Sequence, residues 1–340
     1  MFGGISARKG RRKMKLAKPV KPAKGPESPL KKTKLQLLWL HFKRDWQLHL
    51  LILLPVIYLI IFNYGPMYGA QIAFRNYTPR AGITGSEWVG LKWFEKFLLY
   101  HGFKDLMVNT LAVSLYQIAV GFPLPVIFAL LINTMKAEKF KGFVQNITYM
   151  PHFISTVVLL AIMNMVFSPI NGIYGGLFRL FGGEGYPSDL RGMAHTFRHM
   201  YVWSGVWQQL GWNTIVYTAA LSSVSQELHE AAMLDGASRW KRVIHVDFPT
   251  ILPTVCIMLI MRFGSIMGVG YEKVYLMQTD FNSTVSEVIS TYVYKTGMSS
   301  TRQVSYASAA GIFNSVINCA MLILVNWVTD RLSDGDVGLF

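Results

Sequence analysis

The chain has 340 residues, of which 52% are hydrophobic and only 15% are charged. Soluble domains carry about 25% charged residues, so this composition excludes an ordinary soluble protein and favours a membrane protein. The formal net charge is +15, and most of the excess lies in residues 1–46, where fourteen Lys or Arg face only Glu27 and Asp45. A basic segment beside an apolar span is typical of a cytosolic flank that contacts anionic lipid, not of an arm that binds nucleic acid.

The basic segment, residues 1–46, is expected to lack regular structure up to about Lys31, because prolines are interleaved with its lysines. The residues that follow, 35–48, have the pattern of an interfacial amphipathic helix anchored by Trp39, Phe42 and Trp46. The segment is too long for a signal peptide, and no small-residue cleavage site follows it. We therefore expect an uncleaved signal anchor.

Six stretches are apolar enough, at about 20 residues each, to cross a hydrocarbon core of about 30 Å. They are residues 48–70, 107–132, 145–167, 200–221, 249–270 and 308–329. Prolines and polar residues interrupt them, which is typical of a bundle with a polar interior. The sequence predicts an all-α polytopic membrane protein with a transmembrane domain over 47–332 and a short tail over 333–340.

The loops between these stretches predict the orientation of the chain. The short loops 133–144 and 222–248 carry several Lys and Arg, whereas segments 71–106, 168–199 and 271–307 are longer and mix both signs. Positive charge marks the cytosolic side of a membrane protein. We therefore expect both termini, the tail 333–340 and the loop 222–248 in the cytosol.

The most distinctive motif lies in that cytosolic loop. It reads Glu230, Ala231, Ala232, Met233, Leu234, Asp235, Gly236 and Ala237, and Pro249 follows twelve residues later. Small alanines let a partner approach a short helix closely, glycine permits a turn, and proline suits the first turn of the next helix. The pattern resembles the EAA loop of ABC importer permeases, in which E-A-A, D-G-A and an apolar–Pro pair have the same spacing. Val246 and Phe248 stand where that family more often has Ile and Leu.

Further segments resemble the sugar-importer branch of these permeases, so that the likeness covers about residues 47–332. They are residues 74–79 (FRNYTP), 88–91 (WVGL), 149–155 (YMPHFIS) and 291–294 (TYVY). The resemblance implies a type I importer permease in the bacterial cytoplasmic (inner) membrane, most similar to importers of alginate and other polysaccharide fragments. In that family two permeases pair, usually as a heterodimer, two ATPase subunits dock on the EAA loops, and an extracytosolic solute-binding protein delivers the solute.

The chain lacks the signatures of an enzyme or a nucleotide-binding protein. No Gly-Lys dipeptide occurs, so the chain has no phosphate-binding Walker A loop. We expect no catalytic residue, metal ion or cofactor in this chain, with ATP and Mg²⁺ bound by the separate ATPase. His195 and His199 share a helical spacing of four, but an outer segment without a third ligand favours surface histidines.

Residues suited to a solute path cluster in the fourth apolar stretch. Within eleven residues it contains Trp203, Trp207, Gln208, Gln209, Trp212 and Asn213. Aromatic faces stack on sugar rings, and amides bond to hydroxyl groups. The same residues also fit an aromatic belt at the outer interface with hydrogen bonds between helices, and both interpretations stay open.

Arg262 lies in the fifth apolar stretch, where a charge at mid-bilayer costs about 2.5–3.5 kcal/mol. Two interpretations stay open: the guanidinium binds a carboxylate of the solute, or it bonds to carbonyls of the bundle. In the same region Gly264 and Gly268 are expected at a close helix contact, and Asn314 and Asn318 are expected to bond between helices.

The sequence fits an ATP-driven oligosaccharide importer better than two other classes of membrane protein. A secondary sugar transporter driven by an ion gradient would carry acidic residues within its spans, but Asp and Glu are absent from all six stretches. A membrane-bound sensor would carry an appended soluble domain, whereas the longest outer segment, 271–307, has fewer than forty residues. The importer permease is therefore the favoured function.

Overall fold

The structure is a computed structural model that describes residues 43–298 and 303–332. The chain divides into two compact units, Met1–Gly65 and Pro66–Phe340, which are described separately. In the first unit, α2 (Trp46–Leu59) continues into the π-helical η1 (Ile60–Tyr64). Apolar residues occupy all sides of this rod, which is typical of a helix surrounded by lipid. The basic arm and most of the helix expected over 35–48 lie outside the described residues.

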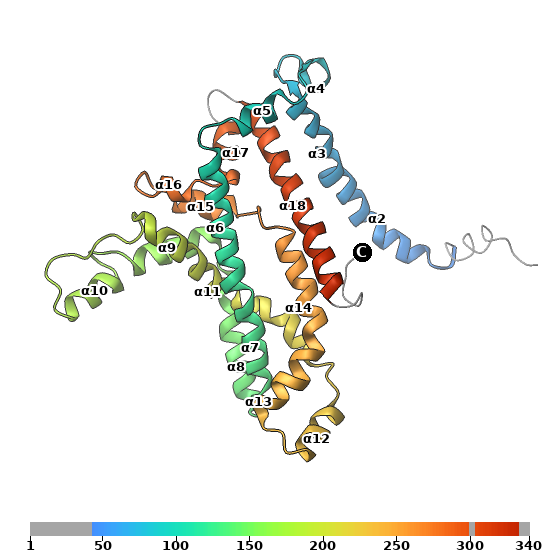
Figure 1. The fold of residues 1–340 in the computed structure, drawn as a ribbon, viewed down its shortest axis with the longest axis vertical. Coiled ribbons are helices and arrows are strands. Elements are labelled where there is room, and N and C mark those ends of the chain that lie inside the picture. The colour runs from blue at the N-terminus through green and yellow to red at the C-terminus, as the bar shows by residue number, and fades with distance from the viewer. Residues whose placement is uncertain (1–42, 299–302, 333–340) are drawn as a thin grey trace, which may run out of the picture. The chain divides into compact units, whose positions relative to one another are not determined.

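The second unit is almost entirely helical (Figure 1). Its elements up to the bend in the third predicted span are α3 (Gly65–Met67, which begins at the last residue of the first unit), η2 (Tyr68–Phe74), β1 (Arg75–Asn76), α4 (Gly82–Gly85), β2 (Glu87–Trp88), α5 (Lys92–Leu98), α6 (Phe103–Gly121), α7 (Pro123–Asn133), α8 (Glu138–Tyr149) and η3 (Met150–Phe153). The remaining elements are α9 (Thr156–Val166), α10 (Ile173–Leu180), α11 (Ala194–Leu221), α12 (Gln226–Leu234), α13 (Arg239–Arg242), η4 (Val243–Asp247), α14 (Phe248–Phe263), α15 (Tyr271–Met277), α16 (Ser283–Ser286), α17 (Ile289–Met298) and α18 (Val304–Leu332). The two short strands pair antiparallel, with Arg75 opposite Trp88.

Helix α11 is the centre of this unit, since it packs against α6, α7, α8, α14 and α15. Two buried clusters hold it. One contains Val113, Phe197, Val202, Val269, Val274 and Val288, and the other contains Val126, Ala129, Tyr217, Leu221 and Ile251. In Figure 1, α12 and α13 lie at one end of the unit, opposite α5 and α17. This arrangement agrees with the predicted assignment of the α12 loop and the α5 and α17 segments to opposite sides of the membrane.

The structure confirms the all-α fold but does not by itself yield six spans. Among the described residues, four helices are long and apolar enough to cross a membrane: Trp46–Phe74, Phe103–Asn133, Arg239–Phe263 and Val304–Arg331. A bent pair, Glu138–Phe153 with Thr156–Val166, gives a fifth if it is counted as one span. The fourth predicted stretch forms α11, which has 28 residues, but its amides make it less apolar than the others. The count of six stays a prediction.

The third predicted span differs from a single helix over 145–167, because the chain bends by 103° between α8–η3 and α9. Pro151 sits in the first turn of η3, where a missing N–H costs nothing, and the chain is extended at Ile154. Ser155 then begins α9 as its N-cap and accepts a hydrogen bond from the Val158 N–H at 3.3 Å. These local signals end one helix and start another inside one apolar run.

The fifth predicted span also differs from its expected bounds of 249–270. The helical rod begins ten residues before Pro249, at Arg239, behind the N-cap Ser238. The π-helical η4 lies just before Pro249, which has no N–H to donate to the helix. The wider turn of η4 accommodates this missing hydrogen bond. Helix α14 then ends at Phe263, so residues 264–270 are not helical.

The non-helical end of this span is held by α18. The Met267 N–H donates to Asn318 Oδ1 at 2.7 Å, and Asn314 Nδ2 donates to the Met267 carbonyl at 3.3 Å. A Cβ added at Gly264 would lie 2.2 Å from the Leu322 side chain, so this glycine allows a close helix contact. The close contact predicted at Gly264 is confirmed. Asn314 and Asn318 bond from α18 to the non-helical segment after α14, not to a second helix as predicted. At Gly268 the three atoms nearest to an added Cβ all belong to Ser265 of the same non-helical segment, so the close helix contact expected there is not found.

Candidate functional site

The EAA-like segment forms α12, a short exposed helix with defined ends. Ser225 is its N-cap and accepts a hydrogen bond from the Glu227 N–H at 3.2 Å. At the other end, Asp235 is the C-cap and Gly236 has φ +76°. The Ala237 N–H donates to the Ala232 carbonyl, and the Gly236 N–H donates to the Met233 carbonyl. This is a Schellman motif, which ends the helix and needs a left-handed residue at Gly236.

The residues of the motif leave α12 open to a partner. Leu234 is 90% exposed and Met233 is 50% exposed, although both are apolar. Glu230, Ala231, Asp235 and Gly236 are also exposed, and Ala232 and Ala237 are half-buried. An exposed apolar tip on a helix at the end of a bundle is suited to insertion into a cleft of another protein.

A buried carboxylate that no sequence motif indicated attaches α12 to the membrane bundle. Asp247, at the junction of η4 and α14, is 3% exposed. Its Oδ1 lies 3.0 Å from His229 Nε2 of α12 and accepts a longer hydrogen bond of 3.5 Å from Asn133 Nδ2 at the end of α7. Its position directly before an apolar run is a sequence signal for such a contact. An unpaired carboxylate there would be costly to bury, so a polar partner is expected.

Arg262 lines a cavity of about 270 Å³ between α7, α11 and α14. Trp212, Asn213 and Tyr217 of α11 line the same cavity. A smaller void beside it is lined by Gln117, Gly205 and Gln209, again with Asn213 and Arg262. Across residues 43–298 and 303–332, no carboxylate forms an ion pair with the Arg262 guanidinium.

The structure divides the set of residues predicted for the solute path. Gln209, Trp212 and Asn213 lie with Arg262 at these two spaces. The Trp212 ring stacks on His152 at 4.1 Å, and Gln209 Oε1 lies 2.9 Å from His152 Nδ1. Gln209 and Trp212 therefore both contact His152 of the bent third span, and they do so on the face of α11 that adjoins Arg262.

The other three members of the set face elsewhere. Gln208 is buried, and its Nε2 donates to the Ile154 carbonyl at 2.7 Å, where it supports the bend of the third span. Trp203 donates from Nε1 to the Tyr116 hydroxyl at 3.1 Å, and it is 52% exposed. Trp207 is 49% exposed. None of these three residues lines the cavity that Arg262 lines.

Lys273, on α15, is a second cation beside α11, and no sequence motif indicated it either. Its Nζ donates to the Tyr201 carbonyl at 2.9 Å and lies 4.7 Å from the centroid of the Tyr201 ring. A Cβ at Gly205 would lie 3.3 Å from this Nζ and 3.9 Å from Gln117 Nε2. Burial lowers the pKa of Lys273 to about 8, so the amine is still mostly protonated at neutral pH.

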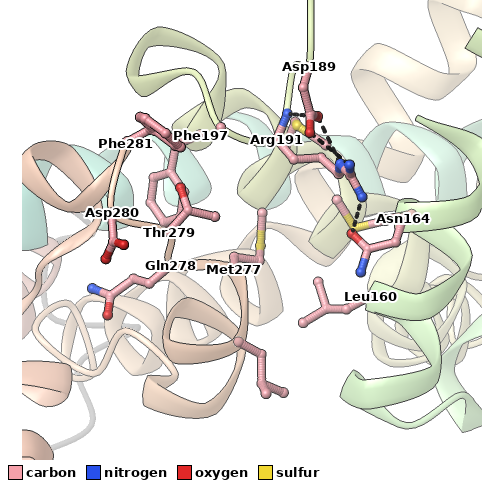
Figure 2. Close-up of a pocket in the computed structure, with 14 residues that line it drawn as sticks. Leu160, Asn164, Asp189, Arg191, Phe197, Met277, Gln278, Thr279, Asp280 and Phe281 are labelled. Carbon is pink, nitrogen blue, oxygen red and sulfur yellow. Dashed lines mark hydrogen bonds and ion pairs between the residues drawn. The ribbon is translucent and has the colours of Figure 1, made fainter. Parts of the chain in front are cut away.

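A separate cavity of about 640 Å³ lies among the outer segments, between α9, the start of α11 and the chain after α15. Figure 2 shows Asp189, Arg191 and Asn164 on one side of it, and Gln278 and Asp280 on the other. Arg191 donates from Nη2 to Asp189 Oδ2 at 2.7 Å and from Nη1 to Asn164 Oδ1 at 3.3 Å. The hydrogen bonds that Arg191 donates to Asp189 lower the pKa of this carboxyl group. No sequence pattern pointed to this group.

A bundle of apolar helices with an exposed helix at one end and a polar cavity inside is the architecture expected of a membrane transport permease. Comparison with known families agrees: residues 121–334 match the family of binding-protein-dependent transport system inner membrane components. The chain belongs to this family. Because the chain belongs to this family, neither an ion-gradient-driven transporter nor a membrane-bound sensor describes it.

Characterised relatives extend the likeness over most of the chain. Protein LplB of Bacillus subtilis (strain 168) is 37% identical over 88% of this chain and 92% of its own length. The polygalacturonan/rhamnogalacturonan transport system permease protein YteP of the same organism is 36% identical over 91% of this chain and 95% of its own length.

A solved structure supports the fold. The crystal structure of a bacterial ABC transporter involved in the import of the acidic polysaccharide alginate contains a chain that is 33% identical, with a TM-score of 0.78. The match covers 87% of this chain and 99% of that one. A second crystal structure, of a bacterial alginate ABC transporter in complex with an alginate pentasaccharide-bound periplasmic protein, contains a chain that is also 33% identical, with a TM-score of 0.78 over 89% of this chain and 99% of that one. The expected likeness to alginate-type permeases is confirmed.

Proposed function

We propose that this chain is the permease subunit of an ATP-driven importer of acidic oligosaccharides. The observation that indicates an acidic substrate is the position of Arg262. This positively charged residue of the membrane bundle lines a cavity and has no carboxylate partner among the described residues. Retaining such a charge is costly unless a wet cavity or a ligand satisfies it. A guanidinium fork matches a carboxylate with two parallel hydrogen bonds.

Two further features support an acidic oligosaccharide. Lys273 places a second cation beside Gly205 of α11, and Gly205 and Arg262 line the same small void. Two cations beside one helix suit a chain that carries more than one carboxylate. YteP is described as a polygalacturonan/rhamnogalacturonan permease, and the solved relative imports an acidic polysaccharide. In this proposal Trp212 stacks on a sugar ring, while Gln209 and Asn213 bond to hydroxyl groups.

The partners follow from the same proposal. The exposed tip of α12, with Met233 and Leu234, docks in a cleft of an ATPase subunit, and Glu230 bonds at the cleft edge. A second permease completes the solute path as the other half of a heterodimer, two ATPase subunits bind ATP and Mg²⁺, and an extracytosolic binding protein delivers the sugar. The complex lies in the bacterial cytoplasmic membrane with both termini of this chain in the cytosol.

Assembly gives the direct test of this function. The chain, expressed with its candidate partner genes, is expected to purify with a second permease and two copies of an ATPase. Native mass spectrometry measures this composition. In proteoliposomes, uptake of an acidic oligosaccharide should require both the binding protein, which delivers the sugar, and ATP, which the separate ATPase subunits hydrolyse. Uptake by this chain alone, or by a homodimer without an ATPase, would contradict the proposal.

The contact between His229 and Asp247 predicts a specific defect in coupling. Among the described residues, His229 gives the only hydrogen bond or ion pair from an α12 side chain to Asp247, and His229→Leu removes it. The buried carboxylate then keeps the longer hydrogen bond from Asn133 and the nearby charge of Arg242, but no link to α12. We expect the number of sugar molecules imported per ATP hydrolysed to fall about tenfold, while ATP is still hydrolysed. The measurement is parallel uptake and phosphate release in the same proteoliposomes.

Matched variants separate coupling from folding. His229→Gln keeps an N–H donor and should retain most of the coupling. His245 lies in the same loop but bonds only to the Lys241 carbonyl of its own helix, at 2.9 Å, so His245→Leu should change the ratio little. If His229→Leu transports with the wild-type ratio, the link plays no part in coupling.

A further inference from the structure

A cavity between α12 and the membrane bundle is more positively charged than either the cavity beside Arg262 or the outer cavity. It has a volume of about 420 Å³ and lies between the end of α7, one face of α12, and α13 with η4. Lys136, Arg239 and Arg242 line it, and Asp247 is the one acidic residue among its lining residues. Three cations therefore meet a single carboxylate.

The three cations are free to bind a ligand in this cavity. Across residues 43–298 and 303–332, their side chains form no ion pair and no hydrogen bond. Asp247 lies near Arg242 but is bonded to His229 instead, and it is buried. Lys136 and Arg239 are exposed, and Arg242 is half-buried, with only its Nε closed to solvent. The charged ends of all three side chains therefore reach the open space.

The charge balance of the wall favours a ligand with two negative charges. A single carboxylate group would leave one of the two excess positive charges unmatched, whereas a phosphate group carries about −1.5 to −2 charges at pH 7 and three strong acceptor oxygens. Guanidinium forks match the geometry of phosphate, and a lysine binds it as a point charge. A hollow lined mainly by one sign of charge also raises the local concentration of ions of the opposite sign.

The apolar residues around the cavity favour a soluble ligand over a lipid headgroup. A bound lipid needs exposed apolar surface for its acyl chains beside the site of its phosphate. Trp240 and Ile244 are the large exposed apolar residues of α13 and η4, but neither lines the cavity. Leu221 and Val243 do line it but are buried, and Met233 lies at the tip of α12.

We propose that this cavity binds the phosphate group of a soluble cytosolic ligand, either inorganic phosphate or a phosphorylated metabolite. Lys136, Arg239 and Arg242 bind the phosphate oxygens. Three residues of α12 line the same cavity, so the bound anion holds α12 against the end of α7 and against α13. Regulation of coupling by this anion rests on the proposed function, in which α12 contacts the ATPase, whereas the binding itself does not.

The test measures binding of inorganic phosphate to the full chain in phosphatidylcholine nanodiscs at constant ionic strength. The ATPase is left out because its nucleotide site also binds phosphate. Thermal-shift titration gives the Kd, and hydrogen exchange followed by mass spectrometry locates the site. Phosphate should raise the Tm saturably and slow amide exchange in residues 226–237 by about threefold or more. Arg242→Gln and Arg239→Gln should each weaken the Kd by about tenfold.

A matched variant separates a defined site from general attraction of anions to a basic surface. Lys241 is exposed on α13 but does not line the cavity, so Lys241→Gln should keep the wild-type Kd. Arg239 is exposed as well, so Arg239→Gln reports on binding even if Arg242→Gln disturbs the fold. No saturable effect of phosphate, a Kd unchanged in Arg239→Gln, or an equal loss in Lys241→Gln would each overturn the site.

Two further measurements identify the ligand and keep the site distinct from the proposed function. Glucose 6-phosphate, titrated in the same way, binds more tightly than inorganic phosphate if the ligand is a phosphorylated metabolite and more weakly if it is the free anion. Uptake of an acidic oligosaccharide by the complete complex is measured separately. Absence of uptake while phosphate still binds counts against the proposed function alone, and uptake without phosphate binding counts against the site alone.

Discussion

Replacing Gly236 with valine is expected to reduce transport at least tenfold while the chain still inserts into the membrane. Gly236 has φ +76°, and no atom lies within 4 Å of the position a Cβ would take. The obstacle is therefore the backbone conformation, which costs about 1–2 kcal/mol for an ordinary residue and more for a β-branched one. Valine would unwind the end of α12 and displace the exposed Met233 and Leu234. Uptake and ATP hydrolysis in proteoliposomes measure the effect.

Two variants separate this effect from a general loss of stability. Gly236→Asn should keep most of the transport, because asparagine tolerates the left-handed region and also ends helices. Gly82 has φ +69° with open space around it, in an outer loop far along the chain from α12, so Gly82→Val imposes a similar strain away from the proposed ATPase contact. Equal losses in Gly82→Val and Gly236→Val, or wild-type transport in Gly236→Val, would refute the docking role of α12.

Replacing Arg262 with methionine is expected to lower the kcat/KM for acidic oligosaccharides by roughly tenfold to a hundredfold, since hydrogen bonds to charged groups contribute about 1.5–3 kcal/mol. Basal ATP hydrolysis and the composition of the complex should be unchanged, because methionine keeps much of the length of the side chain. Uptake of trigalacturonate against its carboxyl-reduced counterpart measures the change in selectivity.

The pattern of rescue identifies the role of the guanidinium. Arg262→Lys keeps the charge but loses the two-pronged geometry, so it should restore only part of the activity. Arg179, in the outer segment, bonds from Nη2 to the Ile170 carbonyl at 3.2 Å, and Arg179→Met is the matched control. Unchanged uptake of trigalacturonate in Arg262→Met would leave this arginine with a structural role, and an importer that accepts only neutral sugars would do the same.

The solute path illustrates what sequence reasoning could not resolve. Six residues within eleven positions of α11 were predicted to line the solute path together. In the structure, however, Gln208 donates to the Ile154 carbonyl and Trp203 donates to the Tyr116 hydroxyl. Only Gln209, Trp212 and Asn213 adjoin Arg262 at the two spaces it lines. Adjacent residues on a helix point about 100° apart, so the neighbours of α11, not its sequence alone, decide which face meets the cavity.

The amino-acid sequence by itself determined the membrane class, the positions of most apolar helices and the coupling motif. These features are local: hydropathy over about 20 residues predicts a span, and the spacing from Glu230 to Pro249 lies within one loop. The tertiary structure decided the 103° bend of the third span and the early end of the fifth. It also brought His229 to Asp247, and Lys136 and Arg242 to one cavity. Those contacts depend on how separate helices pack, and hydropathy carries no information about which polar side chain will find which partner.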